Sequence, residues 1–428
     1  MIRPSRTWRA AALIGVASLT LAACGGEEEP AATPSESESS PSEEAPAAEG
    51  DGELVIGTLL PQTGSLAFLG PPEFAGVQLA INDINEAGGV LGKPVRKIDG
   101  DSGDTTTDIA SQTVDRLLSE KADTIIGAAS SGVSLTVIDK ITGAGVVHFS
   151  PANTSPAFTT YDDKDLFFRT APSDALQGRV LGDRIIEDGF LDVGIMALDD
   201  AYGNGLADAL EATVSDGGGS ATEKIIYNPE AATFSAEVGQ LAASSPEAIV
   251  VIGFEETKKI IPELIAQGIG PDTVPLYLVD GNLADYSADF APGTLAGAKG
   301  TLPGGPDAEG DDFQSRLLAV DPALTDFSYG KESYDATVMT ALAAIAAESD
   351  SGEAIGGSLV DISREGEKCT TFADCVALLE AGEDIDYDGL SGPVDFSDAG
   401  EPSAATIGIY EYGEDNKYTN IDYVEGEV

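Results

Sequence analysis

Short apolar runs alternate with amphipathic stretches along the chain from residue 54 onward. Residues 54–60 form a continuous apolar run typical of a buried strand, and 71–87 carry apolar side chains at helical spacing up to a Gly-Gly pair. Further strands are predicted at 124–127, 146–149, 192–198, 248–253 and 276–280, with helices near 107–120, 130–142, 174–188, 202–216, 233–243 and 255–267. This alternation predicts βαβ units and mainly parallel sheets, so the expected fold class is α/β and doubly wound.

Two breaks in this pattern favour two sheets over one. The segment 167–172 follows the first series of strands, and the Gly/Pro-rich segment 300–310 follows the second. A helix is predicted at 333–347, and strand-like pieces follow at 405–412 and 417–424. Since this final stretch does not look like a separate domain, we expect it to return and complete the two sheets.

The N-terminus has the features of an export signal. Three Arg residues precede an apolar stretch at 10–23 that is too short to span a bilayer stably. The stretch ends in LAACG, which resembles the bacterial lipoprotein signal, so we expect removal of 1–23 and lipid on Cys24. An ordinary signal peptide with an incidental Cys is the alternative. Residues 24–52 are rich in Glu, Pro and Ser, which predicts an acidic, disordered tether behind the lipid anchor.

The charge balance limits the partners. The chain has 22 Lys and Arg against 74 Asp and Glu, a formal net charge of −52, while 42% of its residues are hydrophobic. The apolar share suffices for a folded core, and the strongly anionic surface repels nucleic acid and anionic lipid surfaces. Adaptation to high salt and simple colloidal solubility explain the acidity equally well.

Residues for catalysis are scarce. The single His, His148, lies in an apolar strand, so a His-based metal cluster is excluded and a structural role is favoured. No P-loop or complete dinucleotide fingerprint occurs, so we expect neither an enzyme nor a cofactor. In an exported protein the two remaining thiols, Cys369 and Cys375, should form a disulfide at the start of a helix at 372–381, with a redox site as the alternative.

Binding chemistry gathers where two predicted strands end. Strand 124–127 leads to the hydroxyls of Ser130 and Ser131, and strand 146–149 leads to a loop at 150–156 that is rich in hydroxyls and backbone donors. Ligands of parallel sheets lie beyond the carboxyl ends of the strands, where helix N-termini present free N–H groups. Two neighbouring donor loops suit a carboxylate, although simple helix capping explains any single Ser as well.

Several motifs in order resemble the leucine/isoleucine/valine-binding family of extracytoplasmic solute receptors, which serve ABC importers. The similarity covers nearly all of 53–428. The motifs are GTLLPQTG (57–64), EFAG (73–76), AINDINEAGGVLGKP (80–94), IGAASS (126–131), SPANT (150–154), FRT (168–170), DDAYG (199–203) and DGLSGPVDF (388–396).

The resemblance implies the type 1 periplasmic-binding-protein fold: two Rossmann-like lobes, joined by three crossings, that close over a small molecule. Lobe 1 would comprise 53–169 plus 303–407, and lobe 2 would comprise 170–302 plus 408–428. This agrees with the breaks near 170 and 302. The resemblance also implies a monomer that works with an ABC importer permease.

The family's way of holding an amino acid carries over to four residues. Its carboxylate-binding positions correspond to Ser130, Ala152 and Thr154, in the two donor loops. Its acceptor for the ligand's ammonium group corresponds to Asp280, after the strand predicted at 276–280.

Aromatic side chains are implied around the ligand. Tyr202 would cover it, and Phe254 and Tyr329 fall where the family often has aromatic residues. Leu69 and Asn153 depart from the family pattern, and the family's better-known disulfide near the Ser loop is missing. Side-chain selectivity therefore stays open between an aliphatic amino acid and an amide, urea-like or other small polar ligand.

A mechanism follows from charge matching. A zwitterion buried between lobes needs a partner for each charge, because an unpaired buried ion is costly. Donors on one lobe and an acid on the other meet only when the cleft closes, so the ligand favours the closed state. We therefore expect a lipid-anchored, extracytoplasmic receptor that delivers a branched-chain or similar amino acid to an ABC importer. A sensor that signals to a membrane partner is the rival function.

Overall fold

The computed structural model describes residues 50–306 and 312–428. The predicted signal peptide at 1–23, the lipid site Cys24 and nearly all of the predicted tether at 24–52 lie outside these ranges. Within the described ranges, no helix combines the length and the apolar character needed to cross a membrane.

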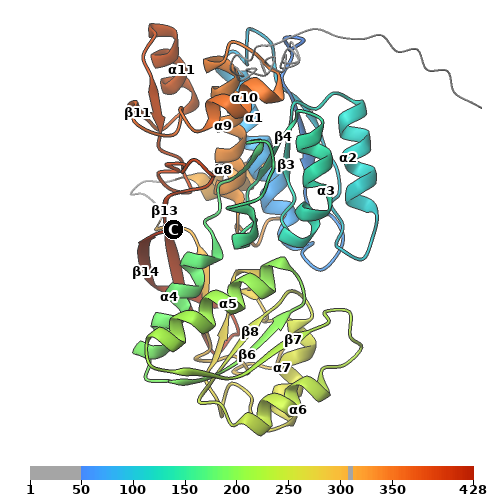
Figure 1. Ribbon diagram of the computed structural model, residues 1–428, viewed down its shortest axis with the longest axis vertical. Helices are drawn as coiled ribbons and strands as arrows, with labels where there is room; N and C mark the ends of the chain where they lie inside the picture. Colours follow the sequence, from blue (N-terminus) through green and yellow to red (C-terminus); the bar gives the residue numbers. More distant parts are fainter. Residues whose placement is uncertain (1–49, 307–311) are drawn as a thin grey trace, which may run out of the picture. The chain divides into compact units, whose positions relative to one another are not determined.

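Lobe 1 is built on a five-stranded parallel sheet with the order β2-β1-β3-β4-β5. The helices α1 and α9 pack against each other on one face, and α2 and α3 cover the other (Figure 1). Strands β1, β3, β4 and β5 are short and buried along their whole length, which matches the apolar runs of the sequence, whereas the edge strand β2 is mostly half-buried. The bounds are β1 Val55–Leu59, β2 Arg96–Ile98, β3 Thr124–Gly127, β4 Val147–Ser150, β5 Phe167–Arg169, α1 Gly70–Glu86, α2 Ile109–Ser119, α3 Ser131–Gly143 and α9 Gly330–Ala346.

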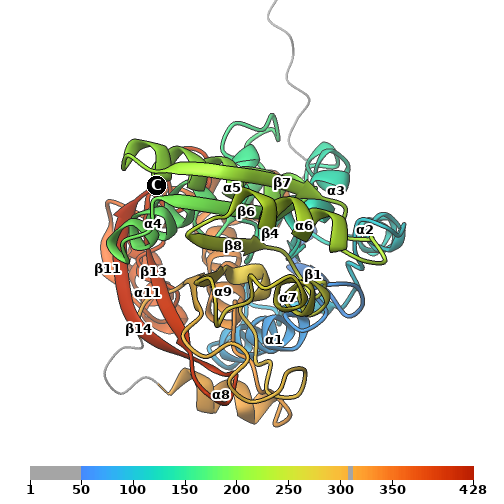
Figure 2. The same ribbon diagram turned by 90° about the horizontal axis from the view of Figure 1, so that it is seen from below.

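Lobe 2 is built on a seven-stranded sheet with the order β14-β13-β10-β9-β8-β6-β7. Its strands are parallel from β10 to β7, whereas β13 and β14 are antiparallel and form one edge of the sheet (Figure 2). The bounds are β6 Asp192–Leu198, β7 Ser220–Tyr227, β8 Ala248–Ile252, β9 Leu276–Leu278, β10 Lys299–Pro303, β13 Ala404–Tyr412, β14 Tyr418–Glu427, α4 Asp174–Glu187, α5 Ala201–Asp216, α6 Ser235–Ser244 and α7 Thr257–Ala266.

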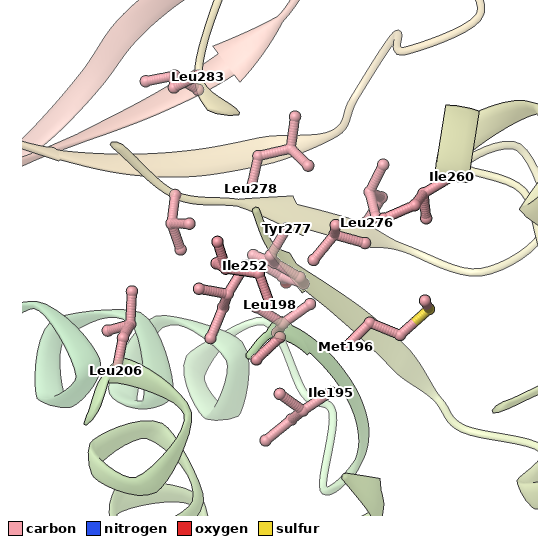
Figure 3. Packing of buried hydrophobic residues seen from close by; sticks show 14 of the residues in the cluster. Ile195, Met196, Leu198, Leu206, Ile252, Ile260, Leu276, Tyr277, Leu278 and Leu283 are labelled. Carbon is pink, nitrogen blue, oxygen red and sulfur yellow. The ribbon is translucent and has the colours of Figure 1, made fainter. Parts of the chain in front are cut away.

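Burial of aliphatic side chains between the sheet and its helices holds lobe 2 together. Ile195 and Leu198 of β6, Ile252 of β8 and Leu206 of α5 meet in one cluster and are at most 1% exposed (Figure 3). Full burial of each such side chain contributes about 1.5–3 kcal/mol. The carboxyl ends of β6, β8 and β9 are thereby fixed relative to one another.

Smaller elements complete the chain. The strands β11 (Glu367–Cys369) and β12 (Ile385–Tyr387) form a two-stranded sheet, and the structure joins Cys369 to Cys375 in helix α11 (Phe372–Ala381). The other short elements are α8 Phe313–Val320, α10 Gly352–Leu359 and the 3₁₀ turns η1 Pro156–Phe158 and η2 Asp280–Asn282.

Several predicted elements match the structure, and some predictions are wrong. The strands predicted at 124–127 and 192–198 are β3 and β6 residue for residue. The break expected at 300–310 begins inside strand β10. Gly300 and Pro303 are residues typical of loops, so this strand was not predicted. The strands β2 and β7 were not predicted, since both carry many polar side chains.

The C-terminal tail does not complete both sheets. Both of its strands, β13 and β14, join the sheet of lobe 2. The expected boundary between 407 and 408 therefore cuts through β13, which begins at Ala404, and the boundary at 302 falls one residue before the end of β10.

A buried ion pair ties two of the segments that connect the sheets. Arg169, at the end of β5, donates from Nε to the carboxylate of Glu401, 2.8 Å away, in the segment that precedes β13. The backbone N–H of Arg169 also donates to the carbonyl of Gly400. Arg169 and Glu401 are both almost fully buried. The ion pair therefore holds the segment that follows β5 against the segment that precedes β13, and both segments connect the two lobes.

Candidate functional site

The two donor loops of lobe 1 are tied together by buried hydrogen bonds. Ser150 donates from Oγ to the carbonyl of Ala128, 2.7 Å away, and accepts the backbone N–H groups of Ala152 and Asn153. The side chain of Asn153 donates to the carbonyls of Ala128 and Ala129. These bonds hold the loop after β4 against the loop after β3.

This bonding revises two expectations. The N–H of Ala152 is already bonded to Ser150, so Ala152 lines the site without offering that donor to a carboxylate. Asn153 is fully buried, and its side chain joins the two loops. It does not line the cavity, so its departure from the family pattern leaves the cavity wall unchanged.

Ser130 has both of the roles considered for it. It is the N-cap of α3, where its Oγ accepts the N–H of Val133, and it also lines the cavity between the lobes. The N-terminus of α3 therefore faces the site, with the partial positive charge that favours an anion.

Asp280 is the acid of the opposite lobe. It begins the turn η2 after β9 and is 5% exposed. The hydroxyl of Tyr202 donates to Oδ1 at 2.6 Å, the hydroxyl of Tyr329 donates to Oδ2 at 2.8 Å, and the amide of Gln177 donates to Oδ1 at 3.0 Å. Three donors from three elements hold the carboxyl group in one orientation.

Burial and hydrogen bonding act on Asp280 in opposite directions. Burial raises the pKa of Asp280, whereas the hydrogen bonds from Tyr202, Tyr329 and Gln177 lower it, and the net direction is upward. Burial, together with the negative charge of Asp280, raises the pKa of both tyrosines well above the usual range, so they stay protonated as donors.

All seven residues named from the resemblance line one cavity. The donor loops and Tyr329 belong to lobe 1, whereas Asp280, Tyr202 and Phe254 belong to lobe 2. Its lining consists of Leu66, Leu69, Ala129, Ser130, Ser131, Ala152, Thr154, Tyr202, Phe254, Asp280, Gly281 and Tyr329.

The two lobes are closed over this cavity. Its volume is about 10 Å³, which is room for about one water molecule. Direct contacts cross between the lobes, since Ser155 donates from Oγ to the carbonyl of Ala201, 2.8 Å away. A wider cavity of about 360 Å³ shares Ser130 and Phe254 with it. Entry of an amino acid therefore requires the lobes to separate.

Aromatic side chains form one wall. The rings of Tyr202 and Phe254 stack with centroids 5.5 Å apart and an interplanar angle of 9°. Tyr329 comes from the segment before α9 and has a φ of 58°, a left-handed conformation that a bulky residue adopts only at a cost in energy. In this backbone conformation the hydroxyl of Tyr329 reaches Asp280.

Sequence reasoning missed residues that support the site. Arg169 donates to the carbonyls of Asn153 and Ser155 and so holds the loop after β4. At the start of α4, Gln177 donates a hydrogen bond to Asp280, and Asp174 interacts with the charge of Asp280. The FRT motif at 168–170 was a signal for Arg169, but no local pattern showed that α4 meets η2.

His148 has a structural place inside the sheet. Within the described residues neither ring nitrogen makes a hydrogen bond of ordinary geometry, and its ring packs edge-on against Phe167. Burial lowers the pKa of His148 to about 3, so it stays neutral inside the sheet.

The fold and the cavity together define a class of protein. Two α/β lobes, joined by several crossings and facing each other across a polar and aromatic cavity, form a binding protein that closes on a small molecule. The model of the periplasmic binding protein family matches residues 53–416, and the chain belongs to this family. Membership places the work of the protein outside the cytoplasm.

Known proteins with similar sequences or folds agree with this assignment. A substrate-binding protein of a chemotactic signal transduction system, BasB of Halobacterium salinarum, is 27% identical over 366 residues, which are 82% of this chain and 84% of that protein. The Leu/Ile/Val-binding protein homolog 1 of Brucella abortus is 26% identical and covers 86% of this chain and 93% of its own. The fold is also that of the branched-chain amino acid transporter substrate-binding protein LivJ of Streptococcus pneumoniae in complex with isoleucine, with a TM-score of 0.71, 21% identity, and coverage of 88% of this chain and 100% of the other.

Proposed function

We propose that this protein captures an amino acid with an aliphatic side chain, of the branched-chain type, by closure of its two lobes. One observation carries the proposal: Ser130 and Thr154 of lobe 1 and Asp280 of lobe 2 line the same cavity. The hydroxyls and the N-terminus of α3 suit the ligand's carboxylate, and Asp280 suits its ammonium. Leu66 and Leu69 supply an apolar wall for the side chain.

The relatives support the same class of ligand. The Brucella abortus protein is described as a homolog of Leu/Ile/Val-binding proteins, and the Streptococcus pneumoniae structure contains isoleucine. On this proposal the protein delivers its ligand to an ABC importer as a monomer. Lipid on Cys24 anchors it outside the membrane through the acidic tether, and the disulfide of Cys369 and Cys375 forms in that compartment.

A thermal-shift screen tests the ligand class. A ligand present at 100 times its dissociation constant adds about 2.7 kcal/mol to the stability of the protein that binds it. Leucine, isoleucine and valine should raise the melting temperature more than amides, urea or sugars. A rise with amides or urea alone would contradict the proposal and favour the small polar ligand.

A sensory function is the second candidate, because the Halobacterium salinarum relative belongs to a chemotactic signalling system. The same cleft chemistry serves either function. If the protein serves transport, deletion of its gene should abolish uptake of the amino acid at low external concentration. Unchanged uptake together with a lost behavioural response would favour the sensor.

Replacing Tyr202 separates the contribution of its ring from that of its hydroxyl. Tyr202→Ala should weaken amino acid binding by about 2 kcal/mol, because it removes the buried ring stacked on Phe254 as well as the donor to Asp280. Tyr202→Phe keeps the ring and should lose less. Calorimetric titration measures both, and an unaltered dissociation constant in Tyr202→Ala would assign Tyr202 to the scaffold.

A further inference from the structure

A second buried acid, Asp174, interacts with the charge of Asp280. It is the first residue of α4 and is 0% exposed. Neither of its carboxyl oxygens has a hydrogen-bond partner among the described residues. Its backbone N–H donates to the carbonyl of Thr154, 2.7 Å away, and Thr154 lines the cavity. The Thr154 hydroxyl also lowers the pKa of Asp174, although it makes no hydrogen bond of ordinary geometry with the carboxyl group. Gln177, one turn along the same helix, donates to Asp280 instead.

The two acids differ in what surrounds them. Burial raises the pKa of Asp174 well above its usual range, and the negative charge of Asp280 raises it further. Asp280 has three hydrogen-bond donors that favour its charged form, whereas Asp174 has no comparable set. One proton between the two carboxyls therefore belongs mainly to Asp174.

The titratable groups that act on Asp174 come from four other parts of the fold. Arg169 is the cation of this set, and its donors are committed to Glu401 and to two backbone carbonyls. The set consists of Arg169 of β5, Asp200 and Tyr202 of α5, Asp280 of η2 and Tyr329 before α9. Asp280 lines the cavity and Asp174 lies behind that lining, so a ligand ammonium group at Asp280 would bring a new cation to this buried cluster.

We infer that Asp174 supplies a second negative charge for the ligand's ammonium group, and that binding of an amino acid expels a proton from the Asp174–Asp280 pair to solvent. This rests on the proposed function, because it takes the ligand to be an amino acid held at Asp280. Two carboxylates around one cation also select for amines, since an amide, a urea or a simple carboxylic acid brings no charge to neutralise them.

The sign of the pH dependence follows from this exchange. Binding favours the state in which both carboxyls are ionised, so it releases a proton wherever the pair still holds one. Affinity should therefore strengthen as the pH rises towards the raised pKa of the unliganded pair, by up to about tenfold per pH unit for one proton.

Calorimetric titration with L-isoleucine in two buffers tests the inference. At pH 7, the purified protein should give different heats in phosphate and in Tris, because each buffer takes up the released proton with a different enthalpy. The dissociation constant should also be lower at pH 8 than at pH 6. Asp174→Asn, which is isosteric and neutral, should abolish both effects.

Asp123→Asn is the matched control. Burial raises the pKa of Asp123 to about 7, but this acid immediately precedes β3, at the opposite edge of the sheet, where it accepts the N–H of Val55. Its replacement should leave the proton release unchanged.

The outcomes are distinct. Tight binding with equal heats in both buffers and no pH dependence overturns this inference and leaves the proposed function standing. Proton release that persists in Asp174→Asn overturns the assignment to Asp174. Failure of the wild-type protein to bind any amino acid overturns the proposed function, and the inference with it. If Asp174→Asn does not fold, Asp174→Ser takes its place with the same two expected results.

Discussion

Arg169→Met is expected to lower the free energy of unfolding by about 3–5 kcal/mol, because it leaves the carboxylate of Glu401 buried without its cation. Arg169 is 0% exposed and Glu401 is 4% exposed, so water cannot replace the lost partner without opening the fold. The substitution also removes the donor to the carbonyl of Asn153 and one of the two donors to the carbonyl of Ser155.

Urea unfolding of three variants measures this effect. The double variant Arg169→Met with Glu401→Leu should recover part of the loss, since it removes the stranded charge together with its partner. Lys121→Met breaks an exposed ion pair with Asp51 and should leave stability nearly unchanged. If Arg169→Met were as stable as the Lys121 control, the buried pair would not hold the crossings together.

Asp280→Asn should weaken amino acid binding by about 2 kcal/mol or more, a loss of roughly 30-fold in affinity, because it removes the charge that matches the ligand's ammonium. The substitution keeps the shape of the side chain. Calorimetric titration with L-leucine provides the measurement, and unchanged affinity would remove Asp280 from the site.

Asp335→Asn offers a matched control for Asp280. Asp335 is also buried and also accepts a tyrosine hydroxyl, that of Tyr387, at 2.8 Å, but it lies on α9 outside the cavity lining. Its replacement should reduce stability, because Leu390 and Ser391 also donate to it, while affinity stays near that of the wild type.

Local patterns were sufficient for much of the fold. Buried parallel strands such as β3 and β6 are short apolar runs, and they were predicted with the right bounds. The edge strand β7 is partly exposed and reads as polar, and β10 carries Gly300 and Pro303, so neither has that signal. The place of β13 and β14 in one sheet depends on long-range pairing, which periodicity does not report.

The site divides in the same way. The loops after β3 and β4 could be placed together from the sequence, because carboxyl ends of neighbouring parallel strands meet at one edge. That they face Asp280 and Tyr202 across a cavity came only from the resemblance. Asp174 and Gln177 could not be predicted, because their part in the site depends on the tertiary contact between α4 and η2. Gln177 and Asp280, which make a hydrogen bond there, are 103 positions apart in the sequence.

Titration with L-leucine, leucinamide and N-acetyl-leucine tests most directly whether the cleft reads both charges of a zwitterion. Leucinamide lacks the carboxylate that Ser130, Thr154 and the N-terminus of α3 would hold, and N-acetyl-leucine lacks the ammonium that Asp280 would hold. Leucine should bind about 100-fold more tightly than either derivative, since each derivative leaves buried polar groups of one lobe unmatched. A derivative that binds as tightly as leucine would contradict this account.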